Sequence, residues 1–248
     1  MDTRTHEQMS PSDRIQAISP WHHSIKISDD VVTPGGVPNA VLERNADIFF
    51  AYGVKGLSVL DVGAWDGFNS FAAEKRGASR VLAVDWFCWG GPGVGKREAF
   101  LLARELLGSK VEDSILDIPD TTVENVGKFD VVLFNGIFYH IIDPIHALLQ
   151  MSRIAKRVLV VETHVDNLDN PRPVMVFYPG EKAPPGHPQN GWGPNPPLMK
   201  ALLKRLGFET VLEVPGYPPD HVGPARSTFL AFKLGHGLDL SRVAGAQS

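Results

Sequence analysis

The chain of 248 residues contains a single cysteine, Cys88, so it cannot form an internal disulfide, and its fold does not depend on an oxidising compartment. It also has no run of the roughly 18 apolar residues that a membrane span requires. The first 20 residues are polar and hold no apolar core of signal-peptide length. We therefore expect a cytoplasmic protein that does not insert into a membrane.

Positive charge is scarce as well. The 24 Lys and Arg residues are outnumbered by 28 Asp and Glu, which gives a formal net charge of −4, and the chain has no Lys/Arg run. Because phosphate binding needs clustered cations, this balance argues against nucleic acid as a partner. Hydrophobic residues make up 43% of the chain, which excludes a disordered protein and permits the core of one large α/β domain.

From residue 57 onward, short apolar runs alternate with amphipathic stretches. Runs such as VVLF at 131–134 are apolar throughout, as in strands that a parallel sheet buries on both faces. The pattern predicts a Rossmann-like, doubly wound α/β fold with a mostly parallel seven-stranded sheet and a C-terminal antiparallel strand pair. The predicted strands are 58–62, 81–85, 111–115, 129–135, 157–163, 208–214 and 227–234, and the predicted helices are 39–53, 69–76, 97–107, 144–155 and 196–206.

We expect three parts along the chain. Residues 1–54 form an N-terminal cap and lead helix, of which 1–20 are predicted to be a polar, partly mobile lead. Residues 55–235 form the main domain, and 236–248 form a tail. A Pro- and Gly-rich insertion at 166–195 is longer than ordinary loops, which predicts either a functional lid or a disordered segment.

The most informative segment is LDVGAWDG, in which a predicted strand runs directly into a turn containing Gly63, Ala64 and Gly67. Glycines allow the backbone to approach a ligand closely, and the N–H groups at the start of the next helix face that ligand. The next strand ends in Asp85, followed by Trp86. A carboxylate at this place can accept hydrogen bonds from ribose hydroxyls.

Two further strand ends carry polar groups. Asp117 lies just beyond the third predicted strand and is followed by Ile118, so its carboxylate could accept a hydrogen bond from an adenine amino group. Asn135 ends the fourth strand. Acidic groups at three successive strand ends, counting Asp61 and Asp85, predict a nucleotide-like ligand at the carboxyl edge of the sheet.

VLDVGAWDG, AVDW, ILDI and FDVVLFNG, in this order and spacing, resemble successive motifs of the class I S-adenosylmethionine-dependent methyltransferases. The first motif of that family is D/E-x-G-x-G-x-G, and this chain departs from it at the central glycine, where Trp65 stands. The resemblance covers about residues 55–235 and implies S-adenosyl-L-methionine as the cofactor. The residues that it implies for cofactor binding are Asp61, Gly63, Ala64, Gly67, Asp85, Trp86, Asp117, Ile118 and Asn135.

A narrower resemblance lies in LFNGIFYHIIDPIHALL and the following VVETH. These segments are similar to the branch that includes the tRNA wobble-uridine carboxymethoxy and methoxy transferases, which typically shows Leu-Tyr-His and then Asp-Pro. Here the matching residues are Phe138-Tyr139-His140 and Asp143-Pro144. Against a tRNA-modifying enzyme stand the acidic balance, the short chain and the apolar residues after His140, where a carboxylated cofactor would need a basic partner.

Two other glycine-rich readings carry less weight. A nicotinamide-binding dehydrogenase also needs a strand, a glycine turn and an acidic strand end, but it prefers G-x-G-x-x-G, and Gly63 lacks that pattern. Residues 90–96 match a phosphate loop as far as Lys96, but Arg97 stands where Ser or Thr must bind Mg²⁺. We interpret 90–96 as a loop that borders the adenosine pocket.

Methyl transfer from a sulfonium is an in-line displacement, so positioning can supply much of the acceleration. A general base is needed only when the acceptor is a hydroxyl or a protonated amine. Tyr139 and His140 follow the fourth predicted strand, where the methyl group should point, and His164 ends the fifth. An imidazole is well matched to this task near neutral pH. We favour His140 as the base, although all three side chains could instead pack structurally.

The insertion carries Tyr178, Trp192 and Asn195, which could enclose an acceptor or could pack the lid onto the edge of the sheet. Nearer the N-terminus, His22 and His23 could cap the site or pack on the surface.

Glu162, His164 and Asp166 alternate along an extended segment, so they could share one face and form a mixed metal site. Neither H-E-x-x-H nor Cys/His zinc spacing occurs in the chain, and we predict no required metal.

We therefore expect an enzyme that transfers a methyl group from S-adenosylmethionine to an O or N atom of a small specialised metabolite. The first alternative is a tRNA wobble-uridine methyl or carboxymethyl transferase, and the second is a non-catalytic S-adenosylmethionine-binding protein. The pattern favours no particular oligomeric state.

Overall fold

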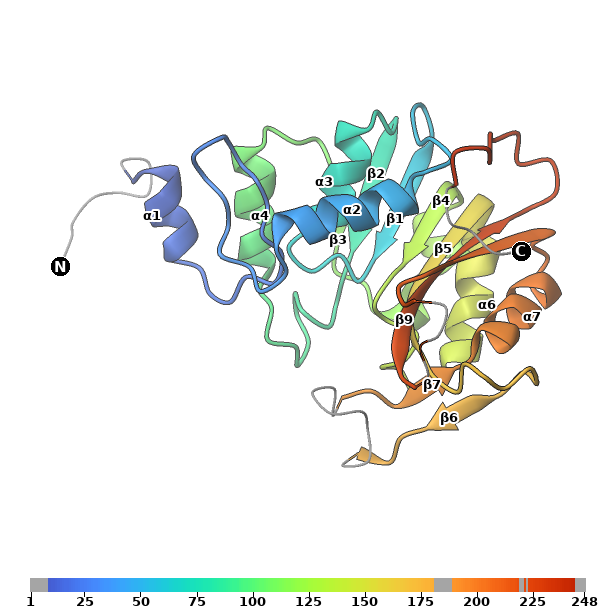
Figure 1. Cartoon of the computed structure of the whole chain (residues 1–248). Helices are drawn as coiled ribbons and strands as arrows, with labels where there is room; N and C mark the ends of the chain where they lie inside the picture. The colour runs from blue at the N-terminus through green and yellow to red at the C-terminus, as the bar shows by residue number, and fades with distance from the viewer. Residues whose placement is uncertain (1–8, 181–188, 219–220, 222, 244–248) are drawn as a thin grey trace.

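A computed structural model describes residues 9–180, 189–218, 221 and 223–243. Its centre is one seven-stranded sheet in the order β3-β2-β1-β4-β5-β9-β8 (Figure 1). The strands are β1 (Ser58–Val62), β2 (Arg80–Val84), β3 (Glu112–Ser114), β4 (Phe129–Phe134), β5 (Ala155–Val165), β8 (Thr210–Pro215) and β9 (Ala225–Phe232). The chain therefore winds outward from β1 in one direction and from β4 in the other, and the carboxyl ends of these two strands form the topological switch point.

Helices cover both faces of the sheet. They are α1 (Pro11–Gln16), α2 (Asn39–Phe49), α3 (Phe68–Lys75), α4 (Arg97–Leu106), α5 (Val123–Val126), α6 (Pro144–Ile154) and α7 (Pro196–Arg205), with a 3₁₀ helix η2 (Ile118–Asp120). Successive strand residues point to opposite faces. Accordingly Val59 packs in one buried cluster with α2, α3 and α4, whereas Leu60 packs in the other with α6 and α7. The predicted doubly wound fold is confirmed, and none of the described helices is long and apolar enough to cross a bilayer.

The C-terminal strands form the predicted antiparallel pair, with one feature that the sequence did not show. β9 lies between β5 and β8 and is antiparallel to both, so β8 is the edge strand. Its pairing with β5 extends as far as Val165 opposite Ala225. This places the start of β9 beside the carboxyl end of β5, where His164 lies.

The predicted mobile lead is wrong for residues 11–16, which form helix α1. Ser10 caps this helix by accepting a hydrogen bond from the N–H of Asp13, and Ile15 is buried. Arg14 makes two hydrogen bonds of 2.7 Å with Glu105 on α4. A helix of this length gains its stability from docking rather than from propensity, so the local sequence gave little sign of it. Residues 1–8 lie outside the described residues.

The insertion at 166–195 contains regular structure. β6 (Met175–Phe177) and β7 (Trp192–Pro194) pair antiparallel in a separate two-stranded sheet, which we call the lid hairpin (Figure 1). Residues 181–188 of the insertion lie outside the described residues.

Asn195 has a structural position at the end of this hairpin. Its side-chain Oδ1 accepts hydrogen bonds from the N–H groups of Leu198, at the start of α7, and of Val174. Its Nδ2 donates to the carbonyl oxygens of Asn170 and Arg172. Because Asn195 is fully buried and its amide is used in these four bonds, we correct our expectation that it binds the acceptor.

We expect Asn195→Ala to lower the free energy of unfolding by about 1–3 kcal/mol, because buried partners lose their hydrogen bonds. Ser10→Ala is the matched control, since it removes an exposed N-cap and should cost only about 0.5 kcal/mol. Chemical denaturation of the two variants measures both values. Equal losses would show that the buried network around Asn195 adds nothing to its role as a cap.

Candidate cofactor and acceptor site

Asp85 directly follows β2 and joins it to the turn after β1. Its carboxylate accepts a hydrogen bond of 2.9 Å from the N–H of Trp65 and one of 2.8 Å from the N–H of Cys88. Asp85 is almost completely buried, and this burial raises its pKa, while the backbone N–H groups act in the opposite direction. The structure therefore brings together the glycine turn and the acidic strand end that the sequence predicted to share a ligand.

The turn itself requires glycine-like backbone at three positions. Gly67 has φ +92°, and a Cβ there would lie 2.5 Å from the ring of Phe100. Gly63 has φ +69°. Trp65, which replaces the central glycine of the family motif, also has positive φ, at +52°. A bulky residue in this region is strained, and such strain is found mainly at functional sites.

Asp61 lies beneath the turn. It is buried in β1, and its Oδ2 accepts a hydrogen bond of 2.6 Å from the Ser70 hydroxyl on α3. Burial raises the pKa of Asp61 to about 6, although the Ser70 hydrogen bond and the charge of His23 oppose the shift. The carboxyl group thus holds the start of α3 against β1 and supports the turn from below.

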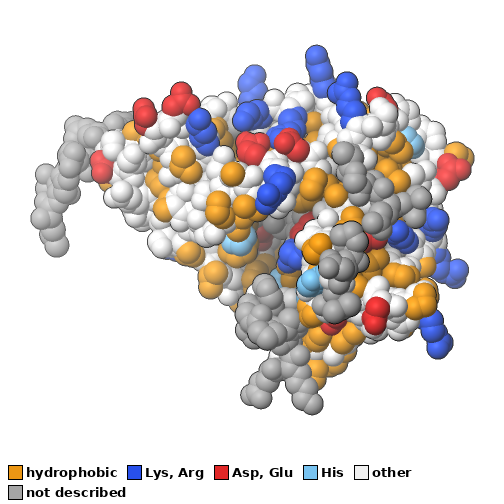
Figure 2. Space-filling view, in the orientation of Figure 1, with side chains coloured by type: hydrophobic (Ala, Val, Ile, Leu, Met, Phe, Trp, Pro, Cys, Tyr) orange, Lys and Arg blue, Asp and Glu red, His pale blue; other side chains and the backbone are white. Residues whose placement is uncertain are grey.

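The other predicted cofactor residues lie at neighbouring strand ends. Asp117 follows β3, and its carboxylate accepts the N–H of Ile118 at the start of η2. Asn135 follows β4, and its Oδ1 accepts the N–H of Glu162 at 3.0 Å. Trp86 is 38% exposed beside Asp85. Figure 2 shows a hollow on this face of the molecule with acidic and histidine side chains at its edge.

Asn135 also tests whether a cofactor fits here. Its side-chain Nδ2 is buried, and no hydrogen-bond partner for it occurs among the described residues. A buried donor of this kind needs a ligand or an ordered water. Gly63 has no side chain to obstruct a ligand, Asn135 Nδ2 offers a donor and Asp85 offers an acceptor. An adenosyl amino-acid cofactor carries polar groups that can pair with both. The residues present therefore fit S-adenosylmethionine.

Tyr139 lies beyond β4 and contacts Arg226 from the start of β9. Its hydroxyl accepts a hydrogen bond of 2.9 Å from Arg226 Nη1, and the guanidinium carbon lies 5.0 Å from the centre of its ring. Arg226 also makes two hydrogen bonds of 2.5 Å to Glu162. The residues that follow His140 in sequence are apolar, as noted above, and the structure brings a cation to Tyr139 from another strand. We missed Arg226 because it is 87 residues away in sequence.

The lid hairpin is attached to the same segment through its backbone. The N–H groups of Gly191 and Trp192 donate to the carbonyl oxygen of Tyr139, at 2.8 and 3.2 Å. The indole N–H of Trp192 donates to the carbonyl oxygen of Ile141, and its ring packs on Phe177. In the described structure Trp192 thus fixes the lid hairpin to the segment that follows β4.

His140 is exposed, and its Nδ1 lies 3.2 Å from the carbonyl oxygen of Gln189 in the lid. A carbonyl oxygen can only accept a hydrogen bond, so Nδ1 must carry the hydrogen. In the neutral imidazole this arrangement makes Nε2 the basic nitrogen. If His140 acts as a general base, Nε2 is therefore the nitrogen that takes the proton.

His164 has the opposite arrangement. It is buried at the end of β5, and its Nε2 lies 3.0 Å from the Tyr178 hydroxyl. That hydroxyl donates its own hydrogen to Asp166 Oδ2 at 2.5 Å, so its oxygen accepts from His164 Nε2–H. Burial raises the pKa of Tyr178, as does the neighbouring Asp166. The three side chains hold the lid to β5.

Asn190 is a further lid residue that sequence reasoning missed. It is 3% exposed, and its Oδ1 is buried without a hydrogen-bond partner in the described part of the chain. Its neighbours on either side, Gln189 and Gly191, contact His140 and Tyr139. The Oδ1 of Asn190 therefore lies in the segment of the insertion that contacts the predicted catalytic residues Tyr139 and His140.

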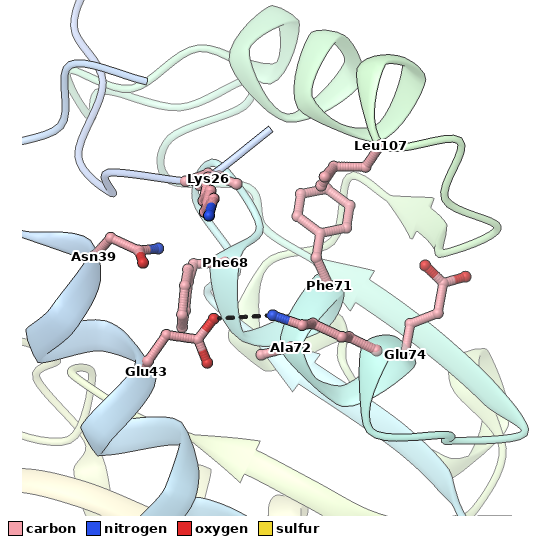
Figure 3. Close-up of a pocket in the computed structure, with 10 residues that line it drawn as sticks. Lys26, Asn39, Glu43, Phe68, Phe71, Ala72, Glu74 and Leu107 are labelled. Carbon is pink, nitrogen blue, oxygen red and sulfur yellow. Dashed lines mark hydrogen bonds and ion pairs between the residues drawn. The ribbon is translucent and has the colours of Figure 1, made fainter. Parts of the chain in front are cut away.

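A pocket of about 290 Å³ lies elsewhere, between α2, α3 and the N-terminal loop (Figure 3). Glu43 and Lys75 face each other across it at 3.4 Å, and Phe68 and Phe71 form part of its wall. None of the predicted site residues lines this pocket. We do not assign it to the cofactor or to the acceptor.

Among the residues that the structure describes, no group of three or more His, Cys, Asp or Glu side chains is placed to hold a metal ion. Glu162 instead pairs with Arg226, and Asp166 accepts the hydrogen of Tyr178.

A family model described as a methyltransferase domain matches residues 38–213, more than half of the chain. The chain belongs to this methyltransferase family. This membership, with the fold, confirms the predicted family, the class I S-adenosylmethionine-dependent methyltransferases.

The curated relatives include proteins named tRNA U34 carboxymethyltransferase. The one from Colwellia psychrerythraea is 28% identical over 165 residues, which are 64% of this chain and 46% of the relative. The one from Shewanella loihica is 29% identical with the same coverage. The chain therefore spans about half the length of these relatives.

Among solved structures, the N-terminal domain of EvdMO1, crystallised in the presence of SAH and D-fucose, has a TM-score of 0.67 and 18% identity. The match covers 93% of this chain and 100% of that one. The 1,6-didemethyltoxoflavin-N1-methyltransferase of Burkholderia thailandensis has a TM-score of 0.55 and 20% identity, and the match covers 78% of each chain. At these identities the likeness shows a common fold.

We expect the protein to bind S-adenosylhomocysteine and not NAD. Asp85→Ala should weaken the binding of S-adenosylhomocysteine by about 1–3 kcal/mol, because buried hydrogen bonds to the carboxylate are lost. Titration calorimetry measures both affinities. Asp29→Ala, at an exposed aspartate, is the control. Unchanged affinity in a folded Asp85→Ala variant would contradict the assignment.

Proposed function

We propose that the protein transfers a methyl group from S-adenosylmethionine to a hydroxyl oxygen of a small-molecule acceptor, with His140 as the general base. The observation that carries this proposal is the hydrogen bond between His140 Nδ1 and the carbonyl oxygen of Gln189, which leaves Nε2 as the basic nitrogen. An acceptor that needed no deprotonation, such as a neutral amine, would not require such an arrangement.

The turn after β1, Asp85 and Asn135 would hold the cofactor, which supplies an electrophilic methyl group when bound. The chain itself supplies position and proton transfer. His140 Nε2 would take the hydroxyl proton while the oxygen bonds to the methyl carbon, whose bond to the sulfonium sulfur would break and leave S-adenosylhomocysteine. Because His140 is exposed, it can pass that proton to water.

The surroundings of His140 favour a small polar acceptor. The ring of Tyr139 packs against His140 with 4.0 Å between ring centres, and the Oδ1 of Asn190 offers a hydrogen-bond acceptor that the described residues leave unmet. Such a mixture suits a hydroxylated molecule of modest size. The fold is shared with a domain crystallised in the presence of D-fucose and with an N1-methyltransferase crystallised with 1,6-didemethyltoxoflavin, which is consistent with a small-molecule acceptor.

We expect His140→Ala to lower kcat by roughly 10²–10⁴-fold, the usual worth of a general base. S-adenosylhomocysteine affinity should change less than about threefold, since the residue acts on the acceptor. The acid limb of the pH–rate profile should disappear with the base. His146→Ala, an exposed histidine near the start of α6, is the matched control and should retain full activity.

A screen of hydroxylated acceptors with methyl-labelled cofactor provides the assay for these variants. If His164→Ala loses the chemical step while His140→Ala keeps it, the base is His164. If both variants stay active with a flat pH profile, the acceptor is an amine or carbon that needs no base, and the hydroxyl assignment is wrong.

A second candidate is transfer of a carboxymethyl group to tRNA. The names of the curated relatives suggest it, and Arg226 beside Tyr139 is a cation that could pair with a carboxylate on the transferred group. We rank it second because Arg226 is already bound to Glu162 and because the chain carries a net charge of −4.

The two candidates differ in tRNA affinity. For the small-molecule enzyme we expect no tRNA binding tighter than the nonspecific range of roughly 10⁻⁴–10⁻⁶ M at physiological salt. Filter binding with total tRNA, repeated at two salt concentrations, measures it. Nanomolar binding that depends on tRNA sequence would reverse the ranking.

A further inference from the structure

An N-terminal segment, residues 21–25, contacts the turn after β1, and its hydrogen bonds to that turn go to the carboxylate of Asp66. Asp66, in the turn after β1, is fully buried and accepts hydrogen bonds from the N–H of His22 at 2.8 Å and the N–H of His23 at 3.0 Å. The Nδ1 of His23 also pairs with the second carboxylate oxygen. One turn residue thus takes both backbone donors and one side chain from the N-terminal segment.

The neighbouring turn residue makes a second attachment. The ring of His22 stacks on Trp65 with 4.0 Å between ring centres and 11° between planes. Trp65 has the strained positive φ noted above, and its carbonyl oxygen accepts the indole N–H of Trp89 at 2.6 Å. Its own N–H donates to Asp85. The stack therefore connects the N-terminal segment to the group that joins β1 and β2.

The N-terminal segment is itself held in shape. The hydroxyl of Thr33 donates to the carbonyl oxygen of His23 and accepts the N–H of Ile25, both at 2.7 Å. Asn39, at the start of α2, donates from Nδ2 to the carbonyl oxygen of Ser24 at 3.0 Å. These bonds present the N–H groups of residues 22 and 23 to Asp66 as a preformed pair.

The charge on Asp66 makes this attachment strong. Burial opposes ionisation of the carboxyl group, but the charge of His23 and the hydrogen bonds from His23 and His22 outweigh it, and the pKa of Asp66 lies below its ordinary value. A buried carboxylate that lost these partners would be costly, so the turn and the N-terminal segment stabilise each other.

We propose that Asp66 is a positioning residue for the cofactor: it binds residues 21–25 to the turn after β1, so that this segment forms part of the S-adenosylmethionine site. Docking of the segment and binding of the cofactor then strengthen each other by the same factor, as linkage requires. The proposal rests on the cofactor role of the turn in the proposed function, and it assigns the His22-His23 pair to that role.

The test uses the whole chain and S-adenosylhomocysteine as the probe. When the probe is bound, we expect the backbone amides of His22 and His23 to exchange with deuterium at least about 5-fold more slowly. This factor is the low end of the usual coupling between two binding sites. Conversely, His22→Ala removes the stack on Trp65 and leaves the residues of the turn unchanged. This variant should bind the probe more weakly by about the same factor. His146→Ala is the control for both measurements.

Asp66→Ala would be expected to act more strongly, but it removes a buried turn residue, so His22→Ala carries the test. Probe binding with unchanged exchange at His22 and His23 would overturn the proposal alone. The proposal alone would also be overturned if His22→Ala exposed those amides but left the affinity for S-adenosylhomocysteine within twofold of the wild type. A wild-type chain that fails to bind the probe would overturn the proposed function and this proposal with it.

Discussion

The site depends on the two backbone hydrogen bonds that Asp85 accepts from Trp65 and Cys88. They fix the turn after β1 relative to the loop after β2, and the indole N–H of Trp89, which donates to the carbonyl oxygen of Trp65, joins the same two segments. A carboxylate buried this deeply must be satisfied, and among the described residues backbone N–H groups satisfy it. The geometry of the cofactor edge is therefore set largely by the main chain.

The acceptor edge is built in a comparable way. The lid hairpin is bound to the carbonyl oxygen of Tyr139, and His140 is oriented by the carbonyl oxygen of Gln189. Side chains complete the attachment at the other end, where His164, Tyr178 and Asp166 form a buried chain. In the described structure the lid is thus held at several points, and a substitution in it should alter the orientation of His140.

The elements that sequence could predict are those with a short-range signal. Apolar runs and the glycine turn located the strands near the site, and the carboxylate at 85 followed from its place at a strand end. The contact between Arg226 and Tyr139 had no such signal, because it arises only when β9 pairs with β5. The attachment of His22 to Asp66 likewise joins segments that only the folded sheet brings together.

The sequence suggested two roles for Asn195, the start of the helix predicted at 196–206 and a contact with the acceptor. Asn195 precedes two prolines at the start of a helix, which is the signature of an N-cap, and the structure uses it as one. We assigned it to the acceptor because it lies in the insertion. Among the described residues of the insertion, the one with an unmet buried polar atom is Asn190, and no periodicity or motif marks it.

The central claim is that the carboxyl ends of β1, β2 and β4 hold an adenosyl cofactor. A crystal structure of the chain with S-adenosylhomocysteine tests it most directly. We predict density for the ligand against the turn at Gly63, with its ribose hydroxyls bonded to Asp85 and a polar group near Asn135 Nδ2. Density in the pocket beside Glu43 and Lys75 instead, with the strand ends empty, would contradict the account.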